Sequence, residues 1–202
     1  MIAIEKFIAD FSKRISQQDK QPWELVLNIG SLIKDKIKLL DHDDYSIDND
    51  IAIHKTAFID SNVIMKAPII IGKDCFVGAN SYLRNGVFLT ENVKIGTGCE
   101  IKSSIIFDNS AVAHFNFIGD SIIGQNVNFE AGSITANHYN ERENKTIFVG
   151  YGEKIIDTHV TKFGSLVGDC SKIGANAVLS PGTILNKKTV VKRLELIEQV
   201  KE

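Results

Sequence analysis

Large apolar residues recur at every sixth position through the middle of this chain. They fill the first place of ten successive hexads: Ile53, Ile59, Met65, Ile71, Val77, Leu83, Leu89, Ile95, Ile101 and Phe107. The fifth places hold only small or β-branched residues, and glycine recurs at the second place, as at Gly72, Gly78 and Gly96. Six is not a helical period and is too long for a simple amphipathic strand. The pattern predicts a parallel β-solenoid in which three hexads close one triangular coil of about 18 residues.

The repeat changes phase and is then interrupted. Two five-residue units replace hexads between residues 113 and 123 (at 113, 118 and 123), and regularity ends near Asn137. The segment of about 137–154 is polar and charged, and it is predicted to be a loop inserted into the solenoid. Hexads resume at Thr161 and continue to Val191. Such insertions often line a functional site.

The two ends have a different pattern. Apolar residues at helical spacing predict one helix over residues 3–18, and Pro22 suits the first turn of a second. This N-terminal helical hairpin and the acidic linker at 41–50 form a first unit, 1–50, expected to act as a cap or an oligomer contact. The solenoid domain is expected at 51–191, and a short C-terminal helix at 192–202 would cover its last coil. The fold class is therefore mainly β.

Composition narrows the classes of partner. A net charge of -2 and a pI of about 6.2 give no general attraction to nucleic acid or to anionic membranes. No apolar stretch approaches the roughly 20 residues of a membrane span, and Glu5, Lys6 and Asp10 argue against a signal peptide. We expect a cytoplasmic protein with reduced cysteines. Cys75 and Cys99 occupy fifth places, so packing explains them.

Arg84 and Lys102 lie at second places one full coil apart. Their side chains should therefore stack on one edge, about 4.8 Å apart. Two adjacent cations favour a bound anion, so the pair could clamp a phosphate. The alternative is a pair of solvated surface residues partnered by Glu100 or Asp120.

His114 lies at the change of phase and could act as a general base. The structural alternative, an exposed or hydrogen-bonded histidine without a catalytic role, is the commoner case. A zinc site would need His114, His138 and His159 to converge, and the spacing does not favour it.

Two runs resemble a known family. Residues 100–137 (EIKSSIIFDNSAVAHFNFIGDSIIGQNVNFEAGSITAN) and 157–183 (DTHVTKFGSLVGDCSKIGANAVLSPGT) are similar to hexapeptide-repeat acyltransferases. The similarity is to the acetyltransferase domain of bifunctional N-acetylglucosamine-1-phosphate uridyltransferase/glucosamine-1-phosphate acetyltransferase and to the β-helical tail of sugar-1-phosphate nucleotidylyltransferases. PWELV at 22–26 resembles the segment before that tail. The resemblance implies a left-handed β-helix, a homotrimer and a role in nucleotide sugar biosynthesis.

The resemblance also implies roles for single residues. His114 would be the general base, and Arg84 and Lys102 would bind the sugar phosphate. Asn128 and Asn137 would bind the sugar. The Ala131 backbone N–H would face the thioester of acetyl-coenzyme A, and Ser165 would contact the coenzyme. No metal is required for this chemistry.

The chain departs from the family at several positions. Phe117 and His138 stand where the family has tyrosines, and Glu143 lies near the place of a loop lysine that Arg142 or Lys145 could replace. We expect an acetyl-coenzyme A-dependent acyltransferase acting on an amino or hydroxyl group of a sugar phosphate. One alternative is a non-catalytic β-helix that binds a sugar phosphate or scaffolds an oligomer. The other is an acyltransferase of the lipid A type that uses acyl carrier protein.

Overall fold

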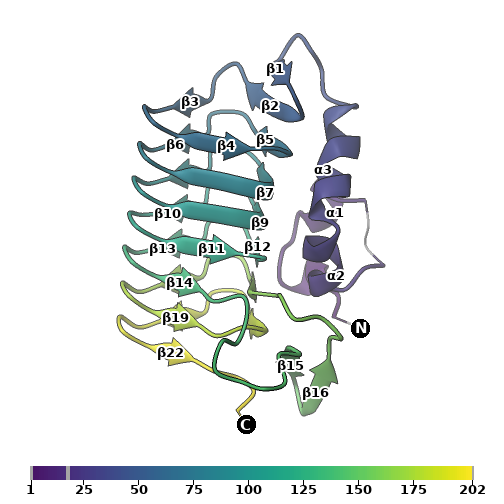
Figure 1. The fold of residues 1–202 in the computed structure, drawn as a ribbon, viewed down its shortest axis with the longest axis vertical. Coiled ribbons are helices and arrows are strands. Elements are labelled where there is room, and N and C mark those ends of the chain that lie inside the picture. The colour runs from purple at the N-terminus through teal and green to yellow at the C-terminus, as the bar shows by residue number, and fades with distance from the viewer. Residues whose placement is uncertain (1, 17–18, 202) are drawn as a thin grey trace.

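Short parallel strands stack in triangular coils along the long axis of the molecule, with the helices along one side (Figure 1). The computed structural model describes residues 2–16 and 19–201. Residues 17 and 18, in the first predicted helix, and residue 202, in the last, lie outside the described residues. The predicted parallel β-solenoid is confirmed by the parallel pairing of successive coils. Its left-handed sense stays a prediction from the resemblance.

The coils present three faces. The seven-stranded face contains β3 (Phe58–Ile59), β6 (Phe76–Val77), β8 (Lys94–Ile95), β10 (Ala111–Val112), β13 (Asn128–Phe129), β18 (Lys172–Ile173) and β21 (Val190–Val191). The bare face contains β4 (Ile64–Lys66), the first halves of β7 (Tyr82–Leu89) and β9 (Glu100–Ile106), β11 (Phe117–Gly119), β14 (Ile134–Thr135), β19 (Val178–Leu179) and β22 (Leu196–Ile197). The covered face contains β2 (Ile51–His54), β5 (Ile69–Ile71), the second halves of β7 and β9, β12 (Ile122–Ile123), β17 (Ser165–Val167) and β20 (Thr183–Leu185).

The repeat shortens by one residue inside the β7–β9 pair. Arg84 pairs with Lys102, 18 residues on, whereas Val87 pairs with Ser104, 17 residues on. The change occurs at a bulge where Asn85 and Gly86 have positive φ angles of 59° and 95°. Gly86 is needed there because a side-chain Cβ would lie 2.7 Å from Ile29 of the helix above.

Because of the bulge, the first five-residue spacing lies earlier in the chain than the sequence pattern predicts. The interior cluster contains Ile101, Ile106, Val112, Ile118 and Ile123, so the five-residue spacings fall at 101–106 and 118–123. Phe107, predicted to point inward, lies outside this cluster. Cys75 and Cys99 are buried in it as expected, and burial raises the pKa of the Cys75 thiol to about 11.

A second apolar cluster lies on the covered face and joins it to the N-terminal segment. Figure 1 shows the helices along this side of the solenoid. Phe11, Trp23 and Ile33 are buried against outward residues of the coils, including Phe88 and Ile105. The Phe11 ring lies 6.0 Å from Phe107, and the Trp23 ring lies 5.9 Å from Phe163. The predicted hairpin therefore covers a side of the solenoid and not its end.

The first predicted helix is broken into a 3-10 helix η1 (Ile4–Lys6) and a short α1 (Phe11–Arg14). Between them some backbone hydrogen bonds stay local, but two backbone groups bond to the solenoid. The Asp169 N–H donates to the Phe7 carbonyl at 2.9 Å, and the Ala9 N–H donates to the Asp169 carboxylate at 2.9 Å. A continuous helix would leave no backbone groups for these contacts.

The second predicted helix is observed as α2 (Pro22–Leu27) and α3 (Ile29–Ile37). Pro22 occupies the first turn, and the Gln21 backbone N–H donates to the Glu24 carboxylate at 2.7 Å as part of a capping box. Asn28, which has a non-helical backbone conformation, separates the two helices. The predicted start of this helix is therefore correct.

Ion pairs tie the N-terminal segment to the corners of the coils. The Arg14 guanidinium contacts Glu91 at 2.8 Å and Asp108 at 2.9 Å. The Lys36 ammonium donates to the Arg14 carbonyl at 2.6 Å, and burial, with the nearby Arg14 charge, lowers its pKa. These contacts fix α1 and α3 against the same part of the solenoid.

Two segments predicted to be irregular contain strands. The acidic stretch at 41–50 contains β1 (Tyr45–Asp48), which pairs antiparallel with β2. The inserted segment ends in a hairpin of β15 (Phe148–Tyr151) and β16 (Lys154–Asp157). It packs on the covered face, where Ile147, Val149 and Phe163 are buried.

The predicted C-terminal helix is wrong: described residues 192–201 contain β22 and no helix. Val178 pairs with Leu196 and Leu179 with Ile197, so the coil continues where a helix was expected. Ile197 follows Val191 by six residues, which keeps the hexad in phase. Across the described part of the chain, no helix is long and apolar enough to span a membrane.

We predict that Phe11→Ala lowers the free energy of unfolding by about 3–5 kcal/mol, the usual cost of removing a buried aromatic ring. Phe11 is 0% exposed. Urea denaturation would measure the loss. The control is Leu39→Ala, which is 85% exposed just after α3 and should change stability by no more than about 0.5 kcal/mol. Equal effects of the two substitutions would contradict this role for Phe11.

Candidate functional site

The predicted site residues fall mainly at the two corners that flank the bare face. The register that pairs Lys94 with Ala111 and Ala111 with Asn128 aligns Thr97, His114 and Ala131 at one corner. We call this the His114 corner. Lys66, Arg84 and Lys102 align at the opposite corner, which we call the cation corner. One chain therefore carries the predicted base and the predicted phosphate clamp on opposite edges of the same face.

The His114 backbone is fixed while its ring is exposed. The His114 carbonyl accepts hydrogen bonds from the Gly132 N–H at 2.9 Å and from the Asn116 side chain at 3.2 Å. The next residue, Phe115, turns the chain with a φ of 56°. The imidazole lies at the surface, 6.5 Å from the Phe115 ring. A general base must be reachable by its substrate, and this position allows it.

Ala131 lies in the same column as His114, one coil further along the chain, and its predicted contact with the coenzyme stays a prediction. It is exposed, and its carbonyl accepts the Asn176 N–H at 3.0 Å. The same column continues through Ala175 to Arg193, because Lys172 pairs with Val190. Arg193 donates two hydrogen bonds of 2.8 Å to Glu130 and lowers the pKa of that carboxyl group.

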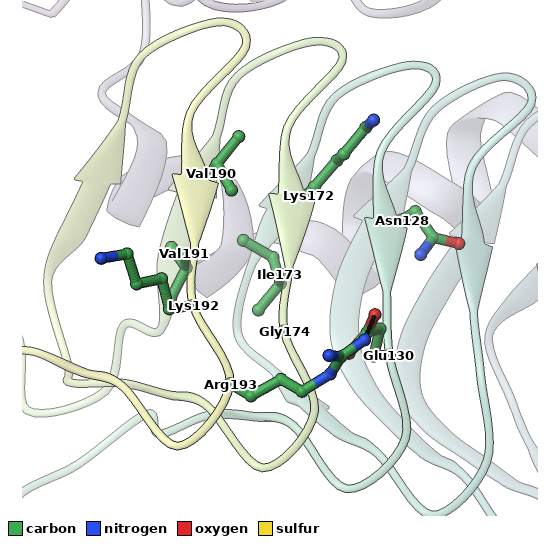
Figure 2. A pocket seen from close by; sticks show the side chains of 9 residues that line it. All are labelled: Asn128, Glu130, Lys172, Ile173, Gly174, Val190, Val191, Lys192 and Arg193. Carbon is green, nitrogen blue, oxygen red and sulfur yellow. Dashed lines mark hydrogen bonds and ion pairs between the residues drawn. The ribbon is translucent and has the colours of Figure 1, made fainter.

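Asn128 lies on the seven-stranded face, away from the cation corner. It lines a shallow pocket of about 470 Å³ beside the His114 column (Figure 2). The pocket is lined by Asn128, Glu130, Lys172, Ile173, Gly174, Val190, Val191, Lys192 and Arg193. Figure 2 shows the Glu130–Arg193 pair across its lower side. Asn128 therefore lies apart from Arg84 and Lys102, and its predicted contact with the sugar stays a prediction.

The predicted stacking of Arg84 and Lys102 is confirmed by their direct pairing between β7 and β9. Each cation also has a carboxylate partner. Arg84 Nε lies 2.7 Å from Glu100, and Lys102 pairs with Asp120. These are the two partners that the alternative interpretation named, yet Lys102 is buried and not solvated. The phosphate clamp stays a prediction. Arg84 is 28% exposed, and a guanidinium has further N–H donors to offer.

Asn137 joins the cation corner through Asp120. Its side-chain Nδ2 donates to the Asp120 carboxylate that also pairs with Lys102, and its Oδ1 lies 3.2 Å from Nδ1 of His138. The structure therefore brings Arg84, Lys102 and Asn137 together. Asp120 is the organising group. Sequence reasoning had named it only as an alternative partner, because the five-residue units obscure which residue follows Lys102 by one coil.

The residues suggested as replacements for a loop lysine are engaged within the loop. The Arg142 guanidinium lies 3.5 Å from the centroid of the Tyr139 ring and 3.2 Å from Glu198. The Lys145 ammonium donates to the carbonyls of Tyr139 and Asn140. The Arg142–Glu198 contact holds the loop against its own solenoid, whereas the hydrogen bonds of Lys145 lie within the loop. That either residue replaces the loop lysine stays a prediction.

Ser165 is completely buried on the inner side of β17. Its N–H donates to the Ser121 hydroxyl at 3.0 Å, and its own hydroxyl has no partner among the described residues. Gly164 before it packs so closely that a Cβ there would lie 2.1 Å from the Gly119 carbonyl oxygen. This burial argues against the predicted contact between Ser165 and a coenzyme.

Within the described residues, no group of three histidine, cysteine, aspartate or glutamate side chains could hold a metal ion. His114, His138 and His159 therefore do not form a zinc site of the kind considered from the sequence. His159 is exposed, and its nearest charged group is Asp157 at 3.3 Å.

Comparison with known proteins supports the family resemblance. The family described as the GMPPB C-terminal domain matches residues 65–150. A bifunctional sugar-1-phosphate nucleotidylyltransferase/acetyltransferase from Sulfurisphaera tokodaii is 36% identical over 211 aligned positions, which cover 87% of this chain and 52% of that protein. The bifunctional protein GlmU of Methanococcus vannielii is 36% identical over 116 positions, covering 57% of this chain and 27% of that protein.

GlmU of Heliobacterium modesticaldum is 33% identical over 138 positions, covering 64% of this chain and 28% of that protein. The chain thus spans about half the length of the Sulfurisphaera relative and about a quarter of the two GlmU proteins. The predicted resemblance to hexapeptide-repeat acyltransferases linked to sugar-1-phosphate nucleotidylyltransferases is confirmed by these matches.

We predict that Asp120→Ala lowers the free energy of unfolding by about 3–5 kcal/mol, because it leaves the buried Lys102 ammonium without its counter-charge. Urea denaturation would measure this. Replacing Lys102 as well, as Lys102→Met with Asp120→Ala, should recover part of the loss, because the buried charge is then removed while the Asn137 amide still lacks its partner. Asp35→Ala, which removes an exposed ion pair with Lys38, is the matched control and should leave the midpoint almost unchanged. A double variant no more stable than Asp120→Ala would contradict this account.

Proposed function

We propose that this chain transfers an acetyl group from acetyl-coenzyme A to an amino or hydroxyl group of a phosphorylated sugar, in nucleotide sugar biosynthesis. The observation that carries the proposal is the 36% identity, across 87% of the chain, to a protein named as a sugar-1-phosphate nucleotidylyltransferase/acetyltransferase. The arrangement of residues around the bare face supports it, since an exposed histidine and a group of cations lie on its two edges.

The transfer needs a general base, a hydrogen-bond donor that stabilises the oxyanion, and a thiol as the leaving group. The acceptor nitrogen or oxygen attacks the thioester carbonyl carbon while His114 takes its proton. The negative charge that develops on the carbonyl oxygen is stabilised by the Ala131 backbone N–H. The carbon–sulfur bond then breaks, and the coenzyme A thiolate leaves with the proton that His114 returns. The exposed Asn128 and the pocket beside it lie on the coenzyme side of this arrangement.

The acceptor binds at the cation corner. Arg84 and Lys102 fix its phosphate, and Asn137, held by Asp120, bonds to the sugar. A phosphate near this corner is attracted by two cations, although Glu100 and Asp120 offset part of that attraction. Arg84, the more exposed of the two, makes the larger contribution to binding.

A complete site requires two copies of the chain. His114 and the cation corner lie on opposite edges of the bare face, so one acceptor cannot reach both within a single chain. In a homotrimer, the His114 corner of one subunit faces the cation corner of the next. The exposed apolar residues of the bare face, Ile64, Ile134 and Leu196, suit such an interface.

A non-catalytic β-helix is the second candidate. The observation that favours it is that Lys102 is buried and already neutralised by Asp120, while the inserted loop folds back on its own solenoid. The two candidates differ in coenzyme binding. Acetyl-coenzyme A raises the melting temperature of an acetyltransferase and leaves that of a scaffold unchanged.

We predict that His114→Ala lowers kcat by roughly 10²–10⁴, the usual contribution of a positioned base, with little change in acceptor affinity. Arg84→Ala should instead weaken acceptor binding by about 1.5–3 kcal/mol, the worth of a charged hydrogen bond. Steady-state kinetics with a sugar 1-phosphate acceptor would separate the two effects. Full turnover in His114→Ala would exclude His114 as the base.

We also predict that the two variants complement each other. Mixing His114→Ala with Arg84→Ala subunits should restore some activity, because part of the mixed trimers then contain an intact site between neighbours. Light scattering should give the mass of a trimer at micromolar concentration, and subunit exchange should be verified with a tagged copy. A monomer, or exchanged mixtures without any recovery, would show that the site is not shared between subunits.

A further inference from the structure

Lys66 is a third cation at the cation corner, one coil before Arg84. It pairs with Arg84 between β4 and β7, in the same way as Arg84 pairs with Lys102 between β7 and β9. Strands of neighbouring coils lie about 4.8 Å apart. Lys66 is exposed, whereas Arg84 is half-buried and Lys102 is buried. Exposure thus increases along the column from Lys102 to Lys66, and Lys66 is the member that a ligand reaches most easily.

Lys66 differs from the other two cations because it has no carboxylate partner among the described residues. Arg84 pairs with Glu100, and Lys102 pairs with Asp120. Those four side chains together carry no net charge, so their attraction for a distant anion is small. With Lys66 the group carries one positive charge. The net attraction of the cation corner for a phosphate therefore depends on Lys66.

Both carboxylates come from coils on the far side of Arg84 from Lys66. Glu100 belongs to the coil after Arg84, and Asp120 belongs to the coil after that. The Glu100 carboxylate accepts the Nε–H of Arg84 at 2.7 Å, while the terminal N–H groups of this guanidinium have no partner among the described residues. A phosphate between Arg84 and Lys66 can therefore accept hydrogen bonds from both side chains.

Tyr82 is a common neighbour of the two cations. The Lys66 ammonium lies 5.4 Å from the centroid of the Tyr82 ring, and the guanidinium carbon of Arg84 lies 5.6 Å from it. An aromatic ring attracts a cation at such distances. Two like charges beside one ring repel each other, and an anion bound to both relieves that repulsion. Tyr82 thus holds Lys66 and Arg84 within reach of one phosphate.

We infer that Lys66 is a phosphate-binding residue, which acts with Arg84 and makes the site selective for phosphorylated acceptors. The inference rests on the proposed function, because the phosphate is that of the proposed acceptor. Lys66 adds to Arg84 and Lys102 the one charge that no described carboxylate neutralises. It binds the ligand and takes no part in the proton transfer.

The experiment measures phosphate binding separately from acetyl transfer. Calorimetric titration of the full chain with inorganic phosphate gives Kd without acetyl-coenzyme A, and steady-state kinetics gives kcat and KM for glucosamine 1-phosphate. Lys66→Gln should raise both Kd and KM about tenfold or more and leave kcat unchanged, the effect of one lost charged hydrogen bond. Lys66→Arg keeps the charge and should restore most of the affinity.

Ionic strength distinguishes an effect of charge from a structural effect. Raising the salt concentration from about 0.1 M to about 1 M shortens the Debye length from about 10 Å to about 3 Å. This change should weaken phosphate binding to the wild-type chain more than to Lys66→Gln, because the cation corner of the variant has no net charge left to screen.

Lys94→Gln is the matched control. Lys94 is an exposed lysine on β8 of the seven-stranded face, so this variant has the same net charge as Lys66→Gln. It should leave Kd and KM at their wild-type values. Light scattering should give both variants the mass of the wild-type assembly.

The same Kd for inorganic phosphate in the wild-type chain and in Lys66→Gln, or no binding to either, would overturn the inference. A smaller assembly in Lys66→Gln would also overturn it, because Lys66 would then be an interface residue. Acetylation of glucosamine 1-phosphate by the wild-type chain would leave the proposed function intact in both cases. A wild-type chain that acetylates none of a panel of amino-sugar phosphates would overturn the proposed function, and the titration would then decide by itself whether Lys66 binds phosphate.

Discussion

Every feature of this molecule depends on the in-register stacking of its coils. Each strand bonds to the strand one coil above and one below, so a residue's place in its coil fixes its column. The chain can change the length of a coil only at a corner, as it does at the bulge of Asn85 and Gly86. The columns of the cation corner and the His114 corner follow from this constraint, because their members are distant in sequence and adjacent in space only through the ladders.

The N-terminal segment determines which surfaces of the solenoid remain available. A three-sided solenoid exposes three similar sheets, and each has outward apolar residues that favour association. Here the helices and the inserted hairpin bury the outward residues of one side, including Phe88, Ile105 and Ile184. The bare face and the seven-stranded face keep theirs exposed. The segment thereby leaves the bare face, the seven-stranded face and the corner between them as the surfaces that can bind a ligand or another subunit.

Features that follow from the strict six-residue period could be predicted from the sequence. Features that depend on contacts between distant residues could not. The hexads predicted the solenoid and the stacking of Arg84 on Lys102. Helical spacing predicted the N-terminal helices, but not that they cover one side of the solenoid. The hexads did not place Phe107, because a one-residue bulge has no compositional signal. A C-terminal helix was predicted wrongly because Val191, Leu194 and Ile197 also fit a helical spacing. The segment forms a strand because it pairs with β19. Asp120 was undervalued because its column is set by the shortened coils, and the burial of Ser165 follows from packing that no short motif encodes.

The contact between Ala9 and Asp169 has a consequence for synthesis of the protein on the ribosome. The two residues are 160 positions apart, so the N-terminal segment cannot reach its final place until nearly the whole solenoid has been made. At translation rates of about 5–20 residues per second, the apolar residues around Phe7 and Ile8 wait roughly 8–30 s for their partner surface. During that interval they are available to chaperones. The segment that emerges first from the ribosome is thus among the last to take its final place. It can dock only after the coils that it contacts have formed.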